Sequence, residues 1–321
     1  MTDIERAQAY EAYMRRRIVG NYLIRIGNLG IGTFAAGTGP EEDVDMGSTV
    51  FIFSDGSTKT FDFKGDISYF TMIDEGIVDQ ENNSWTISPV RIEIGTDVTG
   101  ILNGAFSECP MESVKIPRSV TSLGEGAFYE CRNLSSVMIP DSVVSIGDGA
   151  FYDCLGLTSV TIPKRVTSIG SNSFFGCIGL VEVVIPDSVT SIGGGAFWGC
   201  ANLTRITIPQ AGIDSFGIIL ENNPIGVVIS DSATSIKEGA FYGRTGLTNV
   251  TIGSGMKNIG SKAFYGCTGL TEVAIPGSVT SIGNSAFRNC ENLDCMVIPE
   301  GVSFVGQNAF YTTKMNEAVP T

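Results

Sequence analysis

Apolar residues recur at intervals of about 23 positions along the last three-quarters of the chain. One clear copy runs from Ser142 to Pro163: Ser-Val-Val-Ser-Ile-Gly-Asp-Gly-Ala-Phe is followed by Cys, Leu, Val, Ile and Pro at set positions. The anchor phenylalanines of the copies are Phe106, Phe128, Phe151, Phe174, Phe197, Phe241, Phe264, Phe287 and Phe310. A period of this length predicts a solenoid in which each coil stacks only on its neighbours.

Each repeat contains two extended pieces. The pattern Leu-x-x-Val-x-Ile-Pro predicts a strand whose Val and Ile point inward, because they lie two residues apart. Proline ends this strand, since it cannot donate the next ladder bond. Val-x-x-Ile-Gly then turns the chain, and Gly-x-x-Ala-Phe-x-x-Cys predicts one or two tight helical turns. About ten coils over residues 89–321 predict an α/β repeat solenoid with a parallel β-sheet face, closed by a C-terminal cap.

The sixth repeat, between Phe197 and Phe241, departs from this pattern. Ile219 and Leu220 stand where Ala and Phe belong, and Ser230 replaces the proline that ends the strand. The repeat is also about two residues short. These changes indicate a local irregularity of the solenoid, with a binding notch as the alternative.

Residues 48–88 predict an N-terminal β-hairpin cap. Apolar and polar positions alternate on both sides of Ser54-Asp55-Gly56-Ser57, and Asp-Gly between two such runs favours a hairpin. One aromatic face on a lone hairpin must cover something, and the first coil is the nearest apolar end. A short helix is expected around Tyr69 to Asp74.

Residues 1–47 predict a helix and a linker that serve attachment or oligomerisation. Apolar residues recur at helical spacing in residues 3–18: Ile4, Ala7, Tyr10, Met14 and Ile18. One apolar stripe must pack on the rest of the chain or on another copy. A Gly-rich stretch and the acidic run Glu41–Asp45 follow; this run lacks the turn glycine and distal glutamate of an EF-hand loop, so a solvated loop is expected.

Charge and histidine content exclude several functions. The formal net charge is −14 and the pI is near 4.4, which argues against nucleic acid or anionic membrane as a partner. The chain has no histidine, the usual general base and metal ligand, so we predict no catalytic residues and no cofactor. Residues 1–17 are polar and of mixed charge, which predicts neither a signal peptide nor a membrane span.

Seven of the eight cysteines lie three residues after an anchor phenylalanine. They are Cys109, Cys131, Cys154, Cys177, Cys200, Cys267 and Cys290. The spacing matches no zinc pattern, so no metal site is predicted. Parallel side chains on stacked coils point the same way, which favours a ladder of buried apolar thiols over disulfides. Cys295 lies at an outward strand position and predicts an accessible free thiol.

The motif Ser-Val-Thr-Ser-Ile-Gly-x-x-Ala-Phe-x-x-Cys-x-x-Leu-Thr-x-Val-x-Ile-Pro resembles the BspA-like (Treponema-type) leucine-rich repeat family over residues 89–312. The resemblance implies a leucine-rich-repeat solenoid without catalytic residues. It also implies a role similar to that of bacterial surface adhesins, or of the host-recognition ends of gut-bacteriophage and prophage tail proteins. The lack of a predicted signal or anchor, together with the predicted helix and hairpin at the N-terminus, fits the phage-type role better than the secreted one.

Two surfaces could bind a partner. The outward positions of the sheet carry small side chains and scattered charges without aromatics, which makes this face a poor sugar-stacking groove. Its candidates are Glu182, Arg205, Asn249, Thr251, Glu272 and Cys295. The alternative is the aromatic edge formed by residues that follow the anchors: Tyr129, Tyr152, Trp198, Tyr242 and Tyr265. Packing between adjacent coils is the favoured explanation of that row, since Phe175 occupies the same position.

The sequence therefore predicts a non-enzymatic recognition or adhesion module that binds a host cell surface. Its expected partners are a protein or cell-surface glycoconjugate, other subunits of a larger assembly through residues 1–88, and a second copy of the chain. The alternative function is a rigid spacer or assembly wall in a virion or surface assembly. The expected location is a virion surface or, by a non-classical route, a bacterial cell surface.

Overall fold

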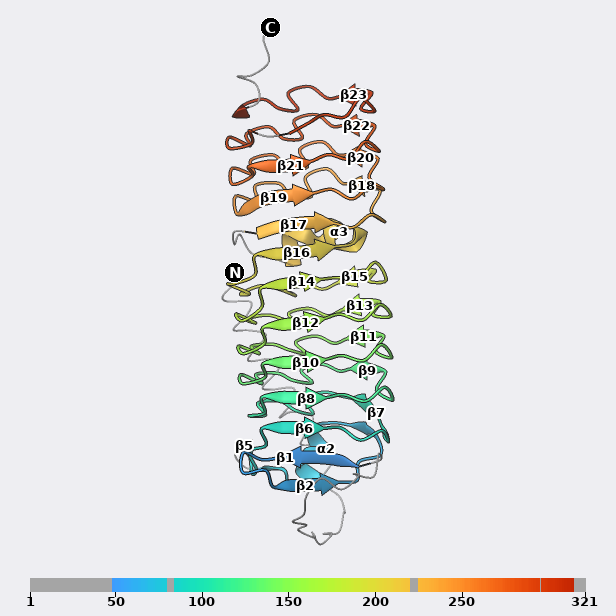
Figure 1. Ribbon diagram of the computed structural model, residues 1–321, viewed down its shortest axis with the longest axis vertical. Coiled ribbons are helices and arrows are strands. Elements are labelled where there is room, and N and C mark those ends of the chain that lie inside the picture. The colour runs from blue at the N-terminus through green and yellow to red at the C-terminus, as the bar shows by residue number, and fades with distance from the viewer. Residues whose placement is uncertain (1–47, 80–83, 220–224, 295, 315–321) are drawn as a thin grey trace.

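The chain forms one elongated column of stacked coils (Figure 1). The computed structural model describes residues 48–79, 84–219, 225–294 and 296–314. The helix and linker predicted within residues 1–47, and the thiol predicted at Cys295, lie outside the described residues. The coils are numbered below by their anchors, so that Phe106 belongs to coil 1 and Phe310 to coil 10.

The main sheet runs the length of the column. Within the described residues it has eleven strands in the order β2-β1-β6-β8-β10-β12-β14-β16-β17-β19-β21. Their bounds are β1 (Thr49–Ile52), β2 (Thr58–Phe61), β6 (Arg91–Glu93), β8 (Ser113–Lys115), β10 (Ser136–Met138), β12 (Ser159–Thr161), β14 (Glu182–Val184), β16 (Arg205–Ile208), β17 (Ile225–Ile229), β19 (Leu247–Thr251) and β21 (Glu272–Ala274). From β6 onward neighbouring strands are parallel, as in the pairing of Val137 with Val160.

The solenoid has about nine turns rather than the ten predicted. Of the described residues in coil 10, 296–298 adopt no strand, and the side chain of Val297 is 79% exposed. Met296 stands where the nine preceding strands carry a β-branched valine or isoleucine. This position also has a strand neighbour on one side only, so both local preference and pairing favour the strand less here.

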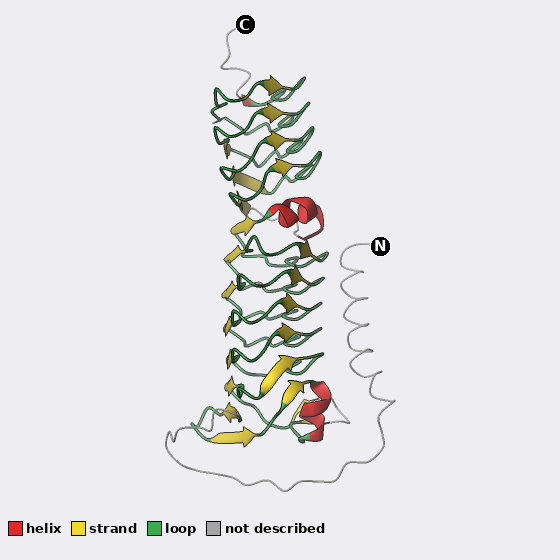
Figure 2. Cartoon of the chain, turned by 90° about the vertical axis from the view of Figure 1, so that its right-hand side faces the viewer, coloured by secondary structure: helices red, strands yellow, loops and turns green. Residues whose placement is uncertain are grey.

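Short strands line a second face of the column (Figure 2). In the described part of the chain they form one sheet in the order β15-β13-β11-β9-β7-β3 and another in the order β18-β20-β22-β23. Their bounds are β3 (Gly65–Ile67), β7 (Val98–Ile101), β9 (Ser122–Leu123), β11 (Ser145–Ile146), β13 (Ser168–Ile169), β15 (Ser191–Ile192), β18 (Ser235–Ile236), β20 (Asn258–Ile259), β22 (Ser281–Ile282) and β23 (Phe304–Val305). The Val-x-x-Ile-Gly piece of the repeat forms these strands.

The predicted hairpin is present at the N-terminal end of the described residues. Strands β1 and β2 pair antiparallel across the Asp55-Gly56 turn, and β1 also pairs antiparallel with β6, the first parallel strand. Phe51, Phe61 and Phe63 are buried. The predicted short helix is α2 (Tyr69–Asp74), and a small antiparallel pair, β4 (Val78–Asp79) with β5 (Ser84–Trp85), follows it.

The helical part of the α/β prediction is wrong. The segment Gly-x-x-Ala-Phe-x-x-Cys forms consecutive turns, and α2 and α3 (Gln210–Ile219) are the α-helices found among the described residues. The residue two positions after the anchor is left-handed, with φ of 53° at Glu130, 52° at Asp153 and 69° at Gly176. In the nine coils that have an anchor phenylalanine, this left-handed residue breaks the run of helical dihedrals, so the chain turns back before an α-helix can form.

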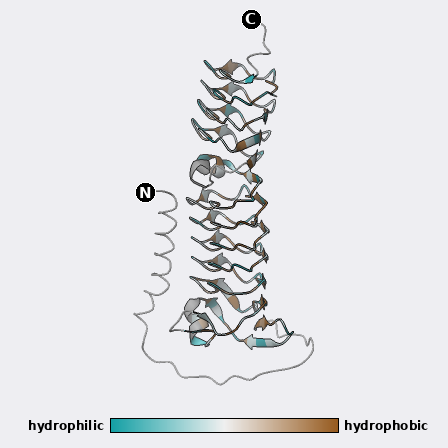
Figure 3. Ribbon diagram, turned by 90° about the vertical axis from the view of Figure 1, so that its left-hand side faces the viewer, coloured by the Kyte–Doolittle hydropathy of each residue, from teal (hydrophilic) through white to brown (hydrophobic). Residues whose placement is uncertain are grey.

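The anchor phenylalanines stack directly on one another inside the column. Neighbouring rings from Phe106 to Phe197 have centroids 5.2–5.5 Å apart, and those from Phe241 to Phe310 have centroids 4.9–5.5 Å apart. These distances are close to the strand spacing of about 4.8 Å, so the rings follow the rise of the coils. Apolar residues recur at matching places from coil to coil (Figure 3), and one continuous core runs from Phe51 to Ala309.

The predicted thiol ladder is confirmed for the seven cysteines at the repeat position, which are free and buried. From Cys131 onward each of these described thiols donates a hydrogen bond to the carbonyl of the anchor phenylalanine one coil earlier, with S···O distances of 2.9–3.2 Å. The ladder thus links neighbouring coils. Burial, with smaller contributions from neighbouring thiols, raises the pKa of the Cys154 thiol well above its usual range.

A glycine follows each of the second-face strands β9, β11, β13, β15, β20, β22 and β23, and it allows neighbouring coils to approach closely. A Cβ atom at Gly170 would lie 2.4 Å from the amide nitrogen of Asp148, and one at Gly193 would lie 2.3 Å from that of Ser171. Both contacts are with backbone, which cannot move aside as a side chain can. A side chain at Gly170 or Gly193 would therefore push two coils apart.

Coil 6 interrupts the second face. Helix α3 follows Pro209 directly, takes the place of a short strand and lies on the second face between β15 and β18 (Figure 2). The Gln210 side chain compensates: its amide nitrogen donates to the Ser235 carbonyl over 2.9 Å, and its oxygen accepts from the Thr234 backbone amide over 3.2 Å. A side-chain amide thus supplies ladder bonds that the missing strand would have made.

We predict that Gly170→Ala destabilises the solenoid by about 1–3 kcal/mol, because its Cβ would overlap the backbone of the preceding coil. Gly277→Ala is the matched control: a Cβ there meets no atom within 4 Å, so a change within about 0.5 kcal/mol is expected. Urea unfolding of both variants measures the difference. Equal midpoints for the two variants would show that the coils can separate at no cost.

We also predict that the free energy of unfolding falls as the pH rises above about 8.5, where unfolded thiols begin to ionise. Above that pH the buried thiols of the folded state keep their protons, whereas the thiols of the unfolded state lose theirs. A rising pH therefore stabilises the unfolded state relative to the folded state. Each such thiol lowers the free energy of unfolding by about 1.4 kcal/mol for each pH unit above this point. Cys154→Ala should make this dependence shallower, which urea midpoints between pH 7 and 10 test. An unchanged slope contradicts the assignment.

Candidate functional site

The outer surface of the main sheet is the larger candidate site. Inward and outward residues alternate along β14 as predicted: Val183 is buried while Glu182 and Val184 are exposed. The same exposed-buried-exposed pattern holds for β10, β12 and β21. Successive strands lie side by side along the column (Figure 1), so their outward positions form two parallel columns facing solvent.

One column brings four of the predicted binding residues together. Strand register pairs Glu182 with Arg205, Arg205 with Gly226, Gly226 with Asn249, and Asn249 with Glu272. These residues thus lie on five adjacent strands of the described sheet, about 4.8 Å apart along the column. Thr251 lies two residues from Asn249 and belongs to the second column.

Gly226, which occupies the middle position of this column on β17, is an exception to the exposure of the outward positions. It is buried, and a Cβ atom there would lie 2.7 Å from Oδ1 of Asn249. The Asn249 side chain therefore leans across the glycine. This leaves Arg205 and Asn249 as the polar groups on either side of a position without a side chain.

The charges of this column are close to one another but remain hydrated. Arg205 Nε lies 3.6 Å from Glu182 Oε1, and both side chains are more than half exposed. An exposed pair at this distance contributes little to stability, so both groups remain available to a partner. On the second column, Met138 and Val184 are exposed apolar side chains.

The aromatic edge does not form one continuous exposed row. Tyr129 and Tyr152 are buried, Trp198 and Tyr265 are half-buried, and Tyr242 is exposed. Neighbouring rings stack, with centroids 5.0 Å apart for Tyr129 and Tyr152 and 5.0 Å apart for Tyr242 and Tyr265. These contacts are the ones expected from packing between adjacent coils.

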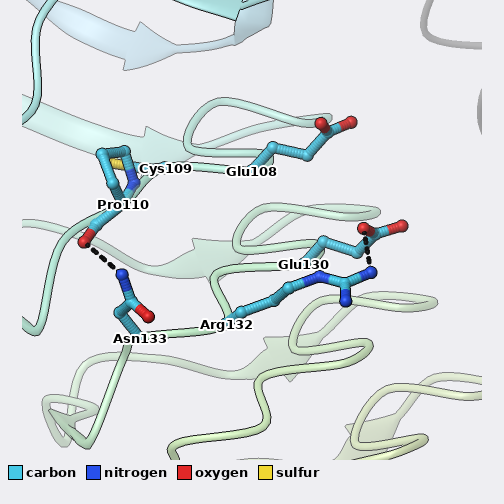
Figure 4. Close-up of a pocket in the computed structure, with 6 residues that line it drawn as sticks. All are labelled: Glu108, Cys109, Pro110, Glu130, Arg132 and Asn133. Atoms are coloured by element: carbon cyan, nitrogen blue, oxygen red, sulfur yellow. Dashed lines mark hydrogen bonds and ion pairs between the residues drawn. The ribbon is translucent and has the colours of Figure 1, made fainter.

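A shallow pocket of about 280 Å³ lies beside this edge (Figure 4). It is lined by Glu108, Cys109, Pro110, Glu130, Arg132 and Asn133. Arg132 Nη2 donates to Glu130 Oε2 over 2.8 Å. That hydrogen bond, together with the charges of Glu130, Asp153 and Glu108, raises the pKa of the Arg132 guanidinium. The pocket edge is therefore acidic.

Two features were not predicted from the sequence: an acidic column formed by Glu108, Glu130 and Asp153 at one position of successive coils, and helix α3. A signal for the first was present: the left-handed position is acidic in three successive coils, at Glu108, Glu130 and Asp153, whereas coils 4, 5, 7 and 8 have glycine. A signal for the second was Pro209 followed by Gln210, where regular repeats continue toward Ser-Ile-Gly. Proline at the start of a helix is favourable because its missing amide hydrogen is not needed there.

Within the described residues, no group of three or more histidine, cysteine, aspartate or glutamate side chains is arranged to hold a metal ion. Over the same residues, no helix has the length and apolar character needed to cross a membrane.

Comparisons with known proteins follow the repeat pattern. Among curated proteins, no sequence matches this chain. Solved structures similar to it include a leucine-rich repeat protein from Bacteroides ovatus (24% identity, 84% of this chain and 92% of the other, TM-score 0.35). The T. pallidum leucine-rich repeat protein is also similar (22% identity, 72% of this chain and 91% of the other, TM-score 0.45). So is a leucine-rich cell surface protein from Faecalibacterium prausnitzii (21% identity, 85% of this chain and 86% of the other, TM-score 0.30).

The family described as "BspA type Leucine rich repeat region" matches residues 91–218 and 221–319, in six copies. This match covers well over half of the chain and includes each of the nine anchor phenylalanines. The chain therefore belongs to the BspA-type leucine-rich repeat family.

Proposed function

We propose that the chain is a non-enzymatic recognition module that binds a macromolecule on the outer surface of its main sheet. The observation that carries the proposal is the column Glu182–Arg205–Asn249–Glu272. It presents negative and positive charge and a side-chain amide along strands β14 to β21. A stacked solenoid holds such groups at set spacings over an extended surface, which suits a macromolecular partner better than a small ligand. Charges of both signs favour specificity for a complementary surface.

A protein partner is favoured over a glycan. The described strands of this face carry no aromatic side chain from β6 to β21, and sugars commonly stack on aromatic rings. Met138 and Val184 add exposed apolar area beside the charged column, as in a protein interface. A cell-surface glycoconjugate is the other source of the ligand, and the experiment below separates the two.

The setting of the proposed role is host-cell recognition, either on a phage tail or on a bacterial surface. Family membership and the likeness of the repeats to surface adhesins support this setting. Residues 1–88 would attach the module to a larger assembly, and the β1–β2 hairpin, which covers β6 with Phe51 buried, would cap the column there. The continuous core from Phe51 to Ala309 favours a second role as a rigid spacer.

We predict that Arg205→Glu weakens capture of the full-length chain on intact cells of gut bacteria at least about 10-fold, corresponding to about 1.4 kcal/mol. Its stability should be unchanged, because the pair with Glu182 is exposed. Arg165→Glu, an exposed arginine away from the sheet face, is the matched control. Fluorescent binding curves measure the difference.

The source of the ligand is tested on the same cells. Loss of capture after protease treatment, with capture retained after periodate oxidation, supports a protein partner. The reverse result assigns the ligand to a glycan. If the wild type and both variants bind equally, or none of them binds, the sheet face is not a recognition surface and the spacer role is favoured.

A further inference from the structure

A row of planar side chains lies along the edge of coils 7–10, at the position directly after each anchor. The members of this tyrosine–arginine row are Tyr242, Tyr265, Arg288 and Tyr311. The backbone holds them in line from coil to coil, as in the hydrogen bond of 2.9 Å from the Gly266 amide to the Arg288 carbonyl. The rings of Tyr242 and Tyr265 stack with centroids 5.0 Å apart. The guanidinium carbon of Arg288 lies 5.0 Å from the ring centroid of Tyr311, within the range of a cation–π contact.

The two ends of the row are open to solvent. Tyr242 is 55% exposed and Tyr311 is 49% exposed. Tyr265 and Arg288, which lie between them, are half-buried. At the same repeat position in coils 2 and 3 the tyrosines are buried, so coils 7–10 form the more accessible part of the aromatic edge.

Arg288 is oriented by Tyr311 but forms no ion pair with a carboxylate of the described residues. Arg132, by contrast, lies 2.8 Å from the carboxylate of Glu130. The Nε atom of Arg288 is buried without a hydrogen-bond acceptor in the described part of the chain. A guanidinium binds a carboxylate through two parallel hydrogen bonds, so Arg288 supplies a pre-oriented site for an anionic group.

The charge of the edge changes sign along the column, from the third residue before each anchor to the fourth residue after it. Over these positions coils 1–3 carry one basic side chain, Arg132, and the acidic side chains Glu108, Glu125, Glu130, Asp148 and Asp153. Coils 7–10 carry two acidic side chains, Glu238 and Glu291, and the basic side chains Arg244, Lys262, Arg288 and Lys314. On a chain with a formal net charge of −14, the edge of coils 7–10 is thus a basic surface that attracts anions.

We propose that the edge of coils 7–10 binds a glycan chain that carries carboxylate groups, with the tyrosine–arginine row as its contact surface. The exposed rings of Tyr242 and Tyr311 offer apolar surface on which sugar rings stack. The guanidinium of Arg288 and the ammonium of Lys262 pair with the carboxylates. Lys262 is exposed and belongs to the same turn as Tyr265, whose amide donates to the Lys262 carbonyl over 3.1 Å.

The length of the row and its polar groups also fit a glycan chain. The ends of the row lie three coil steps apart, about 14 Å, which several linked sugars span and a single sugar does not. The Asn289 amide donates to the Tyr265 hydroxyl over 3.2 Å and accepts from the Thr312 hydroxyl over 2.6 Å. These amide and hydroxyl groups lie beside the rings, where they can hydrogen-bond the hydroxyls of a sugar.

Other polyanions fit the row less well. Nucleic acid carries a charge on each phosphate, and a chain with a net charge of −14 repels it. An acidic peptide would pair with Arg288 and Lys262 but would make no use of the exposed tyrosine rings. The row is also separate from the main-sheet column proposed to bind a protein, so it forms a second binding site.

The experiment is isothermal titration calorimetry of the full-length chain with polygalacturonate at low ionic strength. The wild type should bind this polymer at least about 10-fold more tightly than its methyl-esterified form, which keeps the sugars but lacks the carboxylate charge. Arg288→Gln and Lys262→Gln should each weaken binding at least about 5-fold, because each removes a cation that pairs with a carboxylate. Tyr242→Ala should weaken binding by a similar factor, because it removes an exposed ring at the end of the row away from Arg288.

Lys164→Gln is the matched control, since Lys164 is an exposed lysine in the turn after β12, away from this edge. Arg205→Glu, on the main sheet, should also bind the polymer as the wild type does, so the result is independent of the function proposed for the sheet face. Urea midpoints show whether each variant is folded.

The proposal is overturned if polygalacturonate does not bind the wild type, or if binding is unchanged in either Arg288→Gln or Tyr242→Ala. Equal affinity for the methyl-esterified polymer also overturns it and assigns the row to neutral glycans. Tighter binding of poly-L-glutamate or of single-stranded DNA overturns it as well and assigns the row to another class of polyanion.

Discussion

The register between successive coils is the constraint on which the rest of the structure depends. Each coil must lie about one strand spacing from the next for the ladder bonds of both faces to form. Gly170 and Gly193 permit that approach on the second face, where a Cβ atom would meet backbone at 2.4 Å and 2.3 Å. Once the spacing is set, the anchor rings stack at 4.9–5.5 Å and the thiols reach the carbonyls of the preceding coil.

The same register determines what the surface can present. A side chain repeated at one position forms a column, so a change in a single repeat alters a column at one known height. Coil 6 shows how much change the stack tolerates: α3 replaces a strand, yet Gln210 supplies hydrogen bonds to Thr234 and Ser235 in its place. On the main sheet β16, β17 and β19 remain paired past the irregularity, with a register shift between Ile225 and Gly226, so the strands that carry the proposed binding column stay side by side.

Most of the fold could be predicted because it depends on repeated local rules. Alternation placed Val183 inside and Glu182 outside, and the Asp55-Gly56 turn identified the hairpin. The errors come from features that are not repeated. Helix α3 occurs once, and Gly226 is covered by an Asn249 side chain from the neighbouring strand. The pattern after each anchor predicts helix, because the residue types at Glu130 and Asp153 do not indicate that the backbone there is left-handed.

The two candidate surfaces differ in how much of their side chains water reaches, and this difference bears on which of them can bind a partner. The sheet face is hydrated, with Arg205 and Glu182 more than half exposed, so an incoming partner displaces water from groups already held in place. At the aromatic edge of coils 2 and 3, Tyr129 and Tyr152 are already buried and stack on one another, so they offer an external ligand little free ring surface. Accessible groups held at set spacings favour the sheet face over this part of the edge for recognition.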